Sequence, residues 1–126
     1  MNVADGVFDD GLDAAATRTF LDDPRHHLAV AIDDALVVGF ASGVHYVHPD
    51  KPCPELWINE VGVADAYQGR GIGKLLMQAL LDRARGLGCR EAWVLTDRDN
   101  APAVRLYESA GGTATRDHVM FTFLLA

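Results

Sequence analysis

The chain has 126 residues, of which 49% are hydrophobic and 23% are charged, and its formal net charge is -7 at pH 7. This balance excludes a disordered or fibrous protein, and the negative charge argues against a nucleic-acid binder, which needs basic patches against phosphates. An acidic surface instead favours a cationic partner through long-range attraction.

The first expected element is a short amphipathic helix near the amino terminus. Leu12, Ala16 and Phe20 recur at helical spacing. Asp9 and Asp10 precede them and are candidates to cap the helix, because a carboxylate accepts hydrogen bonds from free amides of the first turn.

A β-hairpin is expected next. Leu28–Ile32 and Leu36–Val47 are rich in branched and apolar residues, and residues 33–35 interrupt them with a short polar segment. Residues 48–54 contain three prolines and therefore predict a surface loop, because proline has no backbone N–H for a sheet ladder.

Leu56–Val63 is expected to be a strand with two distinct faces. Strict alternation puts one set of side chains on one face and one set on the other: Trp57, Asn59, Val61 and Val63 against Leu56, Ile58, Glu60 and Gly62. Glu60 is thus expected to project from a largely buried strand.

The second half alternates helices and strands. An apolar stripe over Ile72–Leu87 predicts a helix that Gly88 closes. Glu91–Thr96 is expected to be a short buried strand, Ala103–Ala110 a helix and His118–Leu125 a last strand. The order predicts an α/β or α+β sheet with helices packed on it.

The length suits one domain spanning residues 1–126, because a chain of this size closes one core. No apolar run reaches the roughly 20 residues that cross a bilayer, and residues 1–10 lack the basic and then apolar character of a signal peptide. Cys53 and Cys89 lack metal or redox spacing and are expected to be free thiols. These features together predict a cytoplasmic protein.

The segment Gln68–Gly73 is the most informative one for chemistry. It lies where a strand gives way to a helix, so free amides converge at the positive end of the helix dipole and favour a phosphate. The dinucleotide fingerprint fails because Lys74 stands where its third glycine belongs. The Walker motif fails because Leu75, rather than Ser or Thr, follows Gly73-Lys74.

The remaining pattern, Q-x-x-G-x-G at Gln68–Gly73, resembles the central motif of the GNAT superfamily of acyl-CoA N-acyltransferases. Asn100–Gly111 resembles the second signature of that superfamily, an Asn followed by A-x-x-L-Y-x-x-x-G. The resemblance spans about Leu28–Leu125 and implies a mixed, mostly antiparallel sheet flanked by helices. Gly112 replaces the usual Phe, and the segment before the hairpin is too short for the usual first strand. A missing strand leaves an open sheet edge, which favours a homodimer.

The resemblance implies acetyl-CoA as the co-substrate and assigns its contacts. The turn would hold the pyrophosphate through Gln68, Gly69, Arg70, Gly71, Ile72, Gly73 and Lys74. The adjoining strand would hold the pantetheine arm through Val61, Gly62 and Val63, and further contacts fall to Asn100, Ala103 and Tyr107. Asn100 is also well placed simply to cap its helix.

Two residues are candidate catalysts. Tyr107 matches the tyrosine of the family that protonates the departing thiolate, with a packed helix tyrosine as the alternative. Glu60 is the candidate base, because a carboxylate on an apolar strand is expected to have a raised pKa. The alternative is that Glu60 only binds the ammonium group of the acceptor.

Asn59–Val63 and Pro102–Tyr107 are similar to aminoglycoside 3-N-acetyltransferases, which implies a small cationic acceptor and a role in antibiotic resistance. Asp97 and Asp99 are candidates to attract such an acceptor, or are solvated turn residues. A protein amino terminus or lysine is the second acceptor class, and a non-catalytic acyl-CoA-binding module is the third reading.

No metal is expected. His45, His48 and Cys53 include metal-binding side chains, but nothing completes the four ligands of a tetrahedral zinc site.

Overall fold

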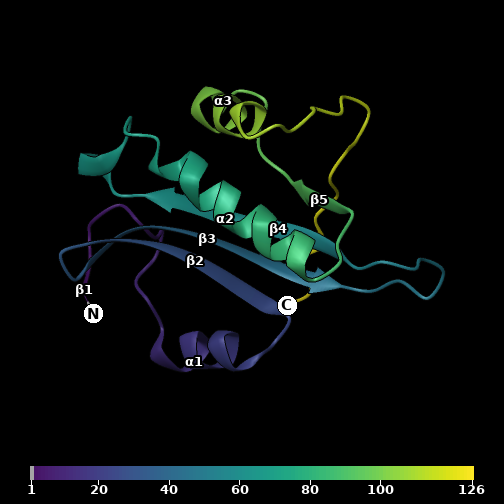
Figure 1. Cartoon of the computed structure of the whole chain (residues 1–126), viewed down its shortest axis with the longest axis horizontal. Coiled ribbons are helices and arrows are strands. Elements are labelled where there is room, and N and C mark those ends of the chain that lie inside the picture. The colour runs from purple at the N-terminus through teal and green to yellow at the C-terminus, as the bar shows by residue number, and fades with distance from the viewer. Residues whose placement is uncertain (1) are drawn as a thin grey trace.

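The computed structural model describes residues 2–126, so that Met1 alone lies outside the described residues. In chain order the elements are β1 (Asn2–Val3), α1 (Ala14–Asp22), β2 (His26–Asp33), β3 (Leu36–Tyr46), β4 (Glu55–Val63), the 3-10 turn η1 (Asp65–Tyr67), α2 (Ile72–Gly86), β5 (Glu91–Val94) and α3 (Ala101–Ser109). Figure 1 shows α2 and α3 on one side of the sheet and α1 on the other. No helix within residues 2–126 is long and apolar enough to cross a membrane.

The five-stranded sheet is organised around β3. β2 pairs with β3 antiparallel along one edge, β4 pairs with it antiparallel along the other, and β5 pairs parallel with β4. β1 pairs parallel with Leu36 and Val37 of β3. At Leu36 and Val37, one edge of β3 is already occupied by β2. β1 therefore pairs with the opposite edge of β3, the edge that β4 occupies further along the strand. The outer edge of β2 stays unpaired within residues 2–126.

The sequence did not predict β1, and it predicted a different start for α1. The helix begins after Asp13, whose carboxylate accepts a hydrogen bond from the Ala16 N–H at 2.7 Å. Asp9, Asp10 and Leu12 therefore lie before the helix, and the proposed caps Asp9 and Asp10 are wrong. Asp13 has the carboxylate and the spacing of an N-cap. It was overlooked because the apolar periodicity starts one residue earlier, at Leu12.

The predicted hairpin (β2 and β3), the strand β4 and the helices α2 and α3 are confirmed as element types. α2 ends at Gly86, and Gly88 adopts the left-handed φ of 87° that lets the chain turn away. Gly88 and Cys89 donate hydrogen bonds back to Arg85 and Ala84, both at 3.0 Å, which satisfies carbonyls at the helix end. β5 is shorter than predicted, because Leu95 is 52% exposed and no longer pairs with β4.

The two-residue turn of the hairpin is strained at Ala35. Asp34 and Ala35 have φ values of 49° and 69°, in the left-handed region that a tight hairpin turn requires. Aspartate tolerates this region, whereas alanine pays a steric cost through its Cβ.

We expect Ala35→Gly to stabilise the protein by about 0.5–1 kcal/mol, because glycine removes the Cβ clash at positive φ. Thermal or urea unfolding measures the difference. Ala15→Gly in the exposed first turn of α1 is the matched control, and it should destabilise by up to about 1 kcal/mol. Equal destabilisation by both substitutions would show that the turn is unstrained.

A bulge in β4 changes which residues share a face. Ser42 of β3 pairs with Glu60, but the next residue, Gly43, pairs with Ile58, so Asn59 is an extra residue in β4. Because Ser42 and Val44 lie two apart, their partners Glu60 and Trp57 share one face. The prediction that Glu60 shares a face with Leu56 and Ile58 is therefore wrong.

The main core lies on the opposite face, under α2. Its buried members come from two strands, β3 and β4, and one helix, α2: Ala41, Leu56, Ile58, Leu76, Met77, Leu80 and Ala84. Val61 and Val63 pack against this cluster from beyond the bulge. A smaller cluster of Val7, Val38, Phe40 and Ala64 lets the amino-terminal segment cover one end of the sheet.

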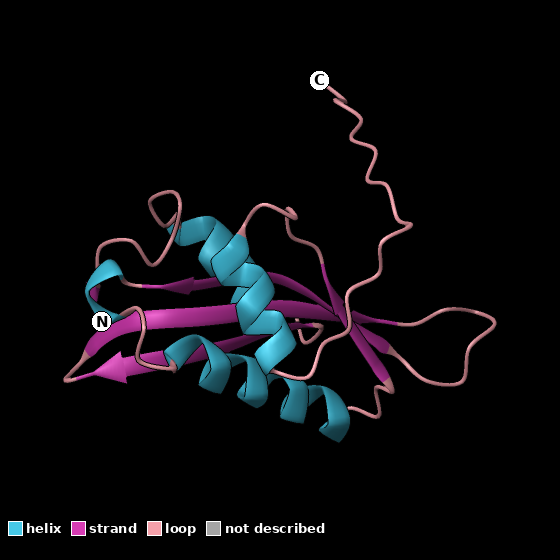
Figure 2. Cartoon of the chain, turned by 90° about the horizontal axis from the view of Figure 1, so that it is seen from above, coloured by secondary structure: helices cyan, strands magenta, loops and turns pink. Residues whose placement is uncertain are grey.

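The predicted last strand, His118–Leu125, is wrong for the chain as described. These residues form no strand, and Val119, Phe121 and Phe123 are 76% to 79% exposed. Figure 2 shows the carboxyl-terminal segment running away from the sheet. The pattern has strand character, but a strand exists only with a partner on its edge.

Candidate active site

The glycine turn leaves the start of α2 open. Gly69 and Gly71 have φ values of 79° and 80°, and a Cβ at either position would meet no atom within 4 Å. Gly71 is the N-cap residue of α2, and no side chain caps the helix. The free amides of the first turn therefore face open space at the positive end of the helix dipole, which suits an anionic group.

The side chains of the turn hold its shape. The Gln68 amide donates to the Val63 carbonyl oxygen at 3.2 Å and thus ties the turn to the end of β4. Arg70 donates to the Ala66 carbonyl oxygen at 3.2 Å, and its guanidinium lies 4.8 Å from the centre of the Tyr67 ring. Lys74, in the first turn of α2, is exposed. Lys74 is thus available for a phosphate, whereas Arg70 is partly engaged within the turn.

α3 packs on the start of α2. A Cβ on Gly73 would lie 3.3 Å from both terminal methyl carbons of Leu106, so glycine permits the close approach of the two helices. Ile72, Leu106 and Tyr107 all pack against the main core. Sequence reasoning did not find Leu106, although its place just before Tyr107 in the second motif was the available signal.

β4 and β5 separate beside this turn. Their last paired residues are Ile58 and Val94, and β4 continues to Val63 without a partner on that edge. Val61, Gly62 and Val63 are half-buried there, and apart from the Val63 carbonyl oxygen, which accepts from Gln68, their outward backbone groups are free to pair with an extended ligand. Gly62 is required for packing, since a Cβ would lie 2.1 Å from the Val7 carbonyl oxygen.

Tyr107 is half-buried on α3 and packs against the core. Burial raises the pKa of its phenol above the ordinary value of 10.0. The hydroxyl makes no hydrogen bond to another residue within residues 2–126, so it is not committed to a structural contact. A tyrosine with a raised pKa stays protonated at neutral pH and can donate its proton.

Asn100 caps α3. Its side-chain oxygen accepts a hydrogen bond from the Ala103 N–H at 3.3 Å, so the capping role considered from the sequence is confirmed. Pro102 is in the first turn, where its missing N–H costs nothing. The cap fixes the start of α3, the helix that carries Tyr107, whereas Asn100 itself is exposed.

The acidic candidates are all on the solvent side. Glu60 is exposed on the face opposite α2, and its carboxylate makes no hydrogen bond or ion pair within residues 2–126. The argument for Glu60 as a base assumed that its carboxylate is buried, and this burial is absent. Asp97 and Asp99 are exposed in the turn before α3, where their carbonyl oxygens accept from the Asn100 and Ala101 amides. An exposed carboxylate suits the binding of an ammonium group better than proton abstraction.

Three of the histidines, His27, His45 and His48, have side-chain partners. His48 Nε2 lies 2.5 Å from Glu55 Oε2, and His45 Nδ1 lies 2.7 Å from His27 Nε2. No group of three or more His, Cys, Asp or Glu side chains converges among residues 2–126.

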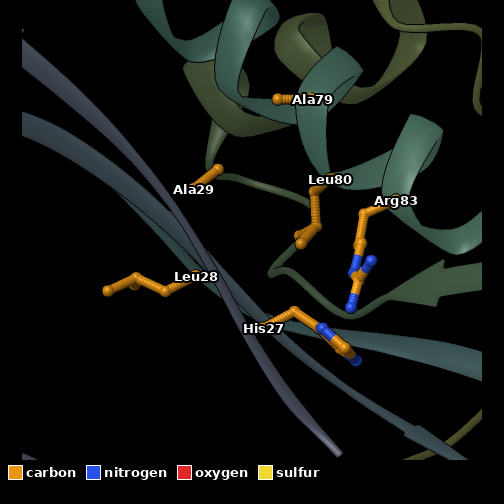
Figure 3. Close-up of a pocket in the computed structure, with 6 residues that line it drawn as sticks. All are labelled: His27, Leu28, Ala29, Ala79, Leu80 and Arg83. Atoms are coloured by element: carbon orange, nitrogen blue, oxygen red, sulfur yellow. The ribbon is translucent and has the colours of Figure 1, made fainter. Parts of the chain in front are cut away.

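A shallow hollow lies between β2 and α2, away from the glycine turn. It is lined by residues of both elements: His27, Leu28 and Ala29 from β2 and Ala79, Leu80 and Arg83 from α2. Figure 3 shows Arg83 pointing toward His27, whereas the Leu28 side chain points away from α2. The pKa of His27 is lowered, mainly by burial and further by the nearby positive charges of His45 and Arg83. None of the residues predicted for acetyl-CoA or the acceptor lines this hollow.

Comparisons with known proteins identify the family of the chain. Residues 4–112 match the model of the acetyltransferase (GNAT) family. The N-alpha-acetyltransferase RimI of Mycobacterium tuberculosis is 41% identical over 105 residues, which cover 83% of this chain and 63% of RimI. A mycothiol acetyltransferase of Corynebacterium glutamicum is 36% identical over 90 residues, 71% of this chain and 29% of that protein. The chain thus spans less than two thirds of these relatives.

Solved structures show the same fold. An aminoglycoside acetyltransferase from an uncultured soil metagenomic sample, in complex with trehalose, superposes with a TM-score of 0.84 at 24% identity. The match covers 93% of this chain and 77% of that structure. The aminoglycoside N-acetyltransferase AAC(6')-Iy in complex with CoA gives a TM-score of 0.76 at 23% identity, covering 89% and 75% of the two chains.

Proposed function

The chain belongs to the acetyltransferase (GNAT) family, and on that premise we propose that it moves an acetyl group from acetyl-CoA to a primary amine. The observation that carries the proposal is the open start of α2. Gly69 and Gly71 turn the chain in the left-handed region, no side chain caps the helix, and nothing fills the space in front of it. A pyrophosphate is the group that such a cradle binds best.

The donor site extends from this turn along β4. The amides from Gly69 to Lys74 hold the pyrophosphate, and the free backbone edge of Val61–Val63 holds the pantetheine arm. An extended arm that pairs with a strand edge gains backbone hydrogen bonds without requiring any particular side chain. The thioester then lies in the opening between β4 and β5, beside α3.

The reaction proceeds by direct attack. The amine nitrogen forms a bond to the thioester carbon, and the carbon–sulfur bond then breaks. The departing thiolate takes a proton from the Tyr107 hydroxyl, which the raised pKa keeps protonated until that step. The amine loses its own proton to water, and solvent restores the proton of Tyr107.

The acceptor is a cationic amine held on the open face of the sheet. Glu60, Asp97 and Asp99 are exposed carboxylates, and the chain as a whole carries a net charge of -7. A small polyamine such as an aminoglycoside suits this charge. The aminoglycoside acetyltransferases of the same fold support this acceptor class, although the sequence identity to them is low.

A peptide amino terminus is the second candidate acceptor. The specific observation in its favour is the 41% identity with RimI, which is named as an N-alpha-acetyltransferase. The exposed position of Glu60 also leaves room for a chain longer than a single sugar.

Release of free coenzyme A thiol tests the proposal. The protein and acetyl-CoA are incubated with aminoglycosides, polyamines and peptides with free amino termini, and the thiol is measured with a chromogenic disulfide. Each amine has its N-acetylated form as a control, which should release none. If acetyl-CoA raises the melting temperature and no amine releases thiol, the chain is the non-catalytic acyl-CoA-binding module instead.

We expect Glu60→Gln to raise the KM for the amine about fivefold, because an exposed carboxylate–ammonium pair is worth about 1 kcal/mol. The KM for acetyl-CoA should not change. Glu91→Gln, on the neighbouring strand and equally exposed, is the matched control. A fall in kcat of about 100-fold in Glu60→Gln would instead make Glu60 the base.

A further inference from the structure

Cys53 and Cys89 are far apart in the chain, but the fold brings them to the same end of the sheet. Cys53 lies in the proline-rich loop before β4, and Cys89 lies between the end of α2 and the start of β5. Figure 1 shows this loop and the connection from α2 to β5 at the end of the sheet that is opposite the glycine turn. Both thiols are free and half-buried.

The register of β4 and β5 places the two cysteines side by side. The first paired residues of these parallel strands are Glu55 and Glu91. Cys53 and Cys89 each precede that pair by two residues, so continuing the register puts them opposite each other. Neighbouring strands lie about 4.8 Å apart, which is within the Cα–Cα range of about 4.4–6.8 Å that a disulfide requires.

The ionisation of Cys89 agrees with this register. Burial is the main cause that raises the pKa of its thiol, and Cys53 and Glu55 raise it further. Cys53 has this effect only if its sulfur lies close to that of Cys89, because charges far apart are screened. No group of three or more potential metal-binding side chains is present among residues 2–126, so the two cysteines form a pair of thiols without a third ligand.

We propose that Cys53 and Cys89 form a reversible disulfide that links the loop before β4 to the start of β5. β5 has four residues, and within residues 2–126 it pairs with β4 alone. A strand with so few contacts is stabilised strongly by a covalent link at its beginning. The disulfide holds the paired ends of β4 and β5 together, while their other ends separate at the opening proposed for the thioester.

A low-molecular-weight disulfide is the oxidant. The Cys53 thiolate attacks one sulfur of this disulfide, which releases one small thiol and leaves a mixed disulfide on Cys53. The Cys89 thiolate then attacks the Cys53 sulfur and releases the second small thiol. Two protein thiols are thus oxidised and one small disulfide is reduced, and the protons of the two cysteines pass through solvent to the released thiolates.

The order of the two steps follows from the surroundings of Cys89. Its raised pKa keeps its thiol protonated, so Cys53 reacts first. Once Cys53 is part of the mixed disulfide it carries no negative charge, which removes one cause of the raised pKa of Cys89. The second step is therefore easier after the first.

Thiol titration and intact mass of the full chain test the disulfide. The reduced protein has two cysteines, and both should titrate after denaturation. After incubation with oxidised glutathione none should titrate, and the mass should fall by two hydrogen atoms instead of rising by glutathionyl groups. A digest without reductant should contain the two cysteine peptides cross-linked, and dithiothreitol should restore both thiols.

The two single variants separate the steps. Cys89→Ser should stop at the mixed disulfide, with one glutathionyl group per chain, because the resolving thiol is absent. Cys53→Ser should react with oxidised glutathione at least about tenfold more slowly than Cys89→Ser, because its remaining thiol is the one with the raised pKa.

Oxidation should raise the melting temperature of the wild type by about 10 °C, because the disulfide closes a long loop in the unfolded chain. The melting temperature of either single variant should not rise under the same treatment. Amide hydrogen exchange over Glu91–Val94 should be slower in the oxidised wild type than in the reduced protein.

Three results would overturn the proposal. They are a wild type that gains two glutathionyl groups, a disulfide that links two chains instead of one chain to itself, and an oxidised wild type that melts at the temperature of the reduced form. None of these measurements uses acetyl-CoA or an amine, so their outcome is separate from that of the proposed activity.

Discussion

Gly71→Asp is expected to weaken the binding of acetyl-CoA at least about 100-fold. The new carboxylate would stand in the open space before α2, where the pyrophosphate is proposed to lie. Two charges about 4 Å apart repel by about 4 kcal/mol near a protein surface, and loss of about 2.7 kcal/mol already corresponds to 100-fold. Calorimetric titration of acetyl-CoA measures the change.

Gly71→Asn separates charge from backbone strain. Asparagine and aspartate have nearly the same size, and both tolerate the left-handed φ of 80° at this position. The Asn variant should therefore lose far less affinity than the Asp variant. Gly11→Asp adds the same charge in an exposed loop, where a Cβ meets no atom within 4 Å, and should bind as the wild type does. Equal losses in Gly71→Asn and Gly71→Asp would show that no anion lies at the turn.

Tyr107→Phe is expected to lower kcat about 100-fold and to leave the affinity for acetyl-CoA within about twofold, because a general acid acts on the departing group and not on the bound donor. The phenyl ring remains and keeps its packing against the core. Steady-state thiol release and calorimetry on the same preparation give the two quantities. An unchanged kcat would remove Tyr107 from the mechanism.

Tyr46→Phe is the control for the loss of a phenol elsewhere. The Tyr46 hydroxyl accepts a hydrogen bond from the Trp93 indole at 2.6 Å, so its loss should lower the melting temperature without lowering kcat.

The pH dependence of kcat provides a second check on the role of Tyr107. Because burial raises the pKa of Tyr107, its protonated form persists above pH 10, and ionisation of this residue should cause no loss of rate at lower pH.

The sequence predicted the elements that have strong local signals. The apolar stripe of α2, the polar break in the hairpin and the glycine turn before α2 each depend on residues close together in the chain. The turn in particular could be located because glycine takes a φ near 80° at the lowest cost of any residue, so Gly69 and Gly71 indicate the backbone conformation directly.

The sequence did not predict the features that depend on a partner strand. The bulge at Asn59 exists because Ser42 pairs with Glu60 while Gly43 pairs with Ile58, and alternation along β4 alone cannot show it. The exposed position of Glu60 follows from that bulge. Segment 118–125 has the composition of a strand, but whether it forms one depends on which edge it meets.

We propose that the glycine turn and the free edge of β4 together form a site for acetyl-CoA. Calorimetric titration of acetyl-CoA into the wild-type protein tests it most directly, with S-acetylpantetheine, which lacks the pyrophosphate, titrated under the same conditions. We predict one site per chain for acetyl-CoA and binding of S-acetylpantetheine at least about 100-fold weaker, because the turn supplies the anion contacts. No heat of binding for acetyl-CoA, or equal affinity for the two ligands, would show that the turn does not bind the pyrophosphate of acetyl-CoA.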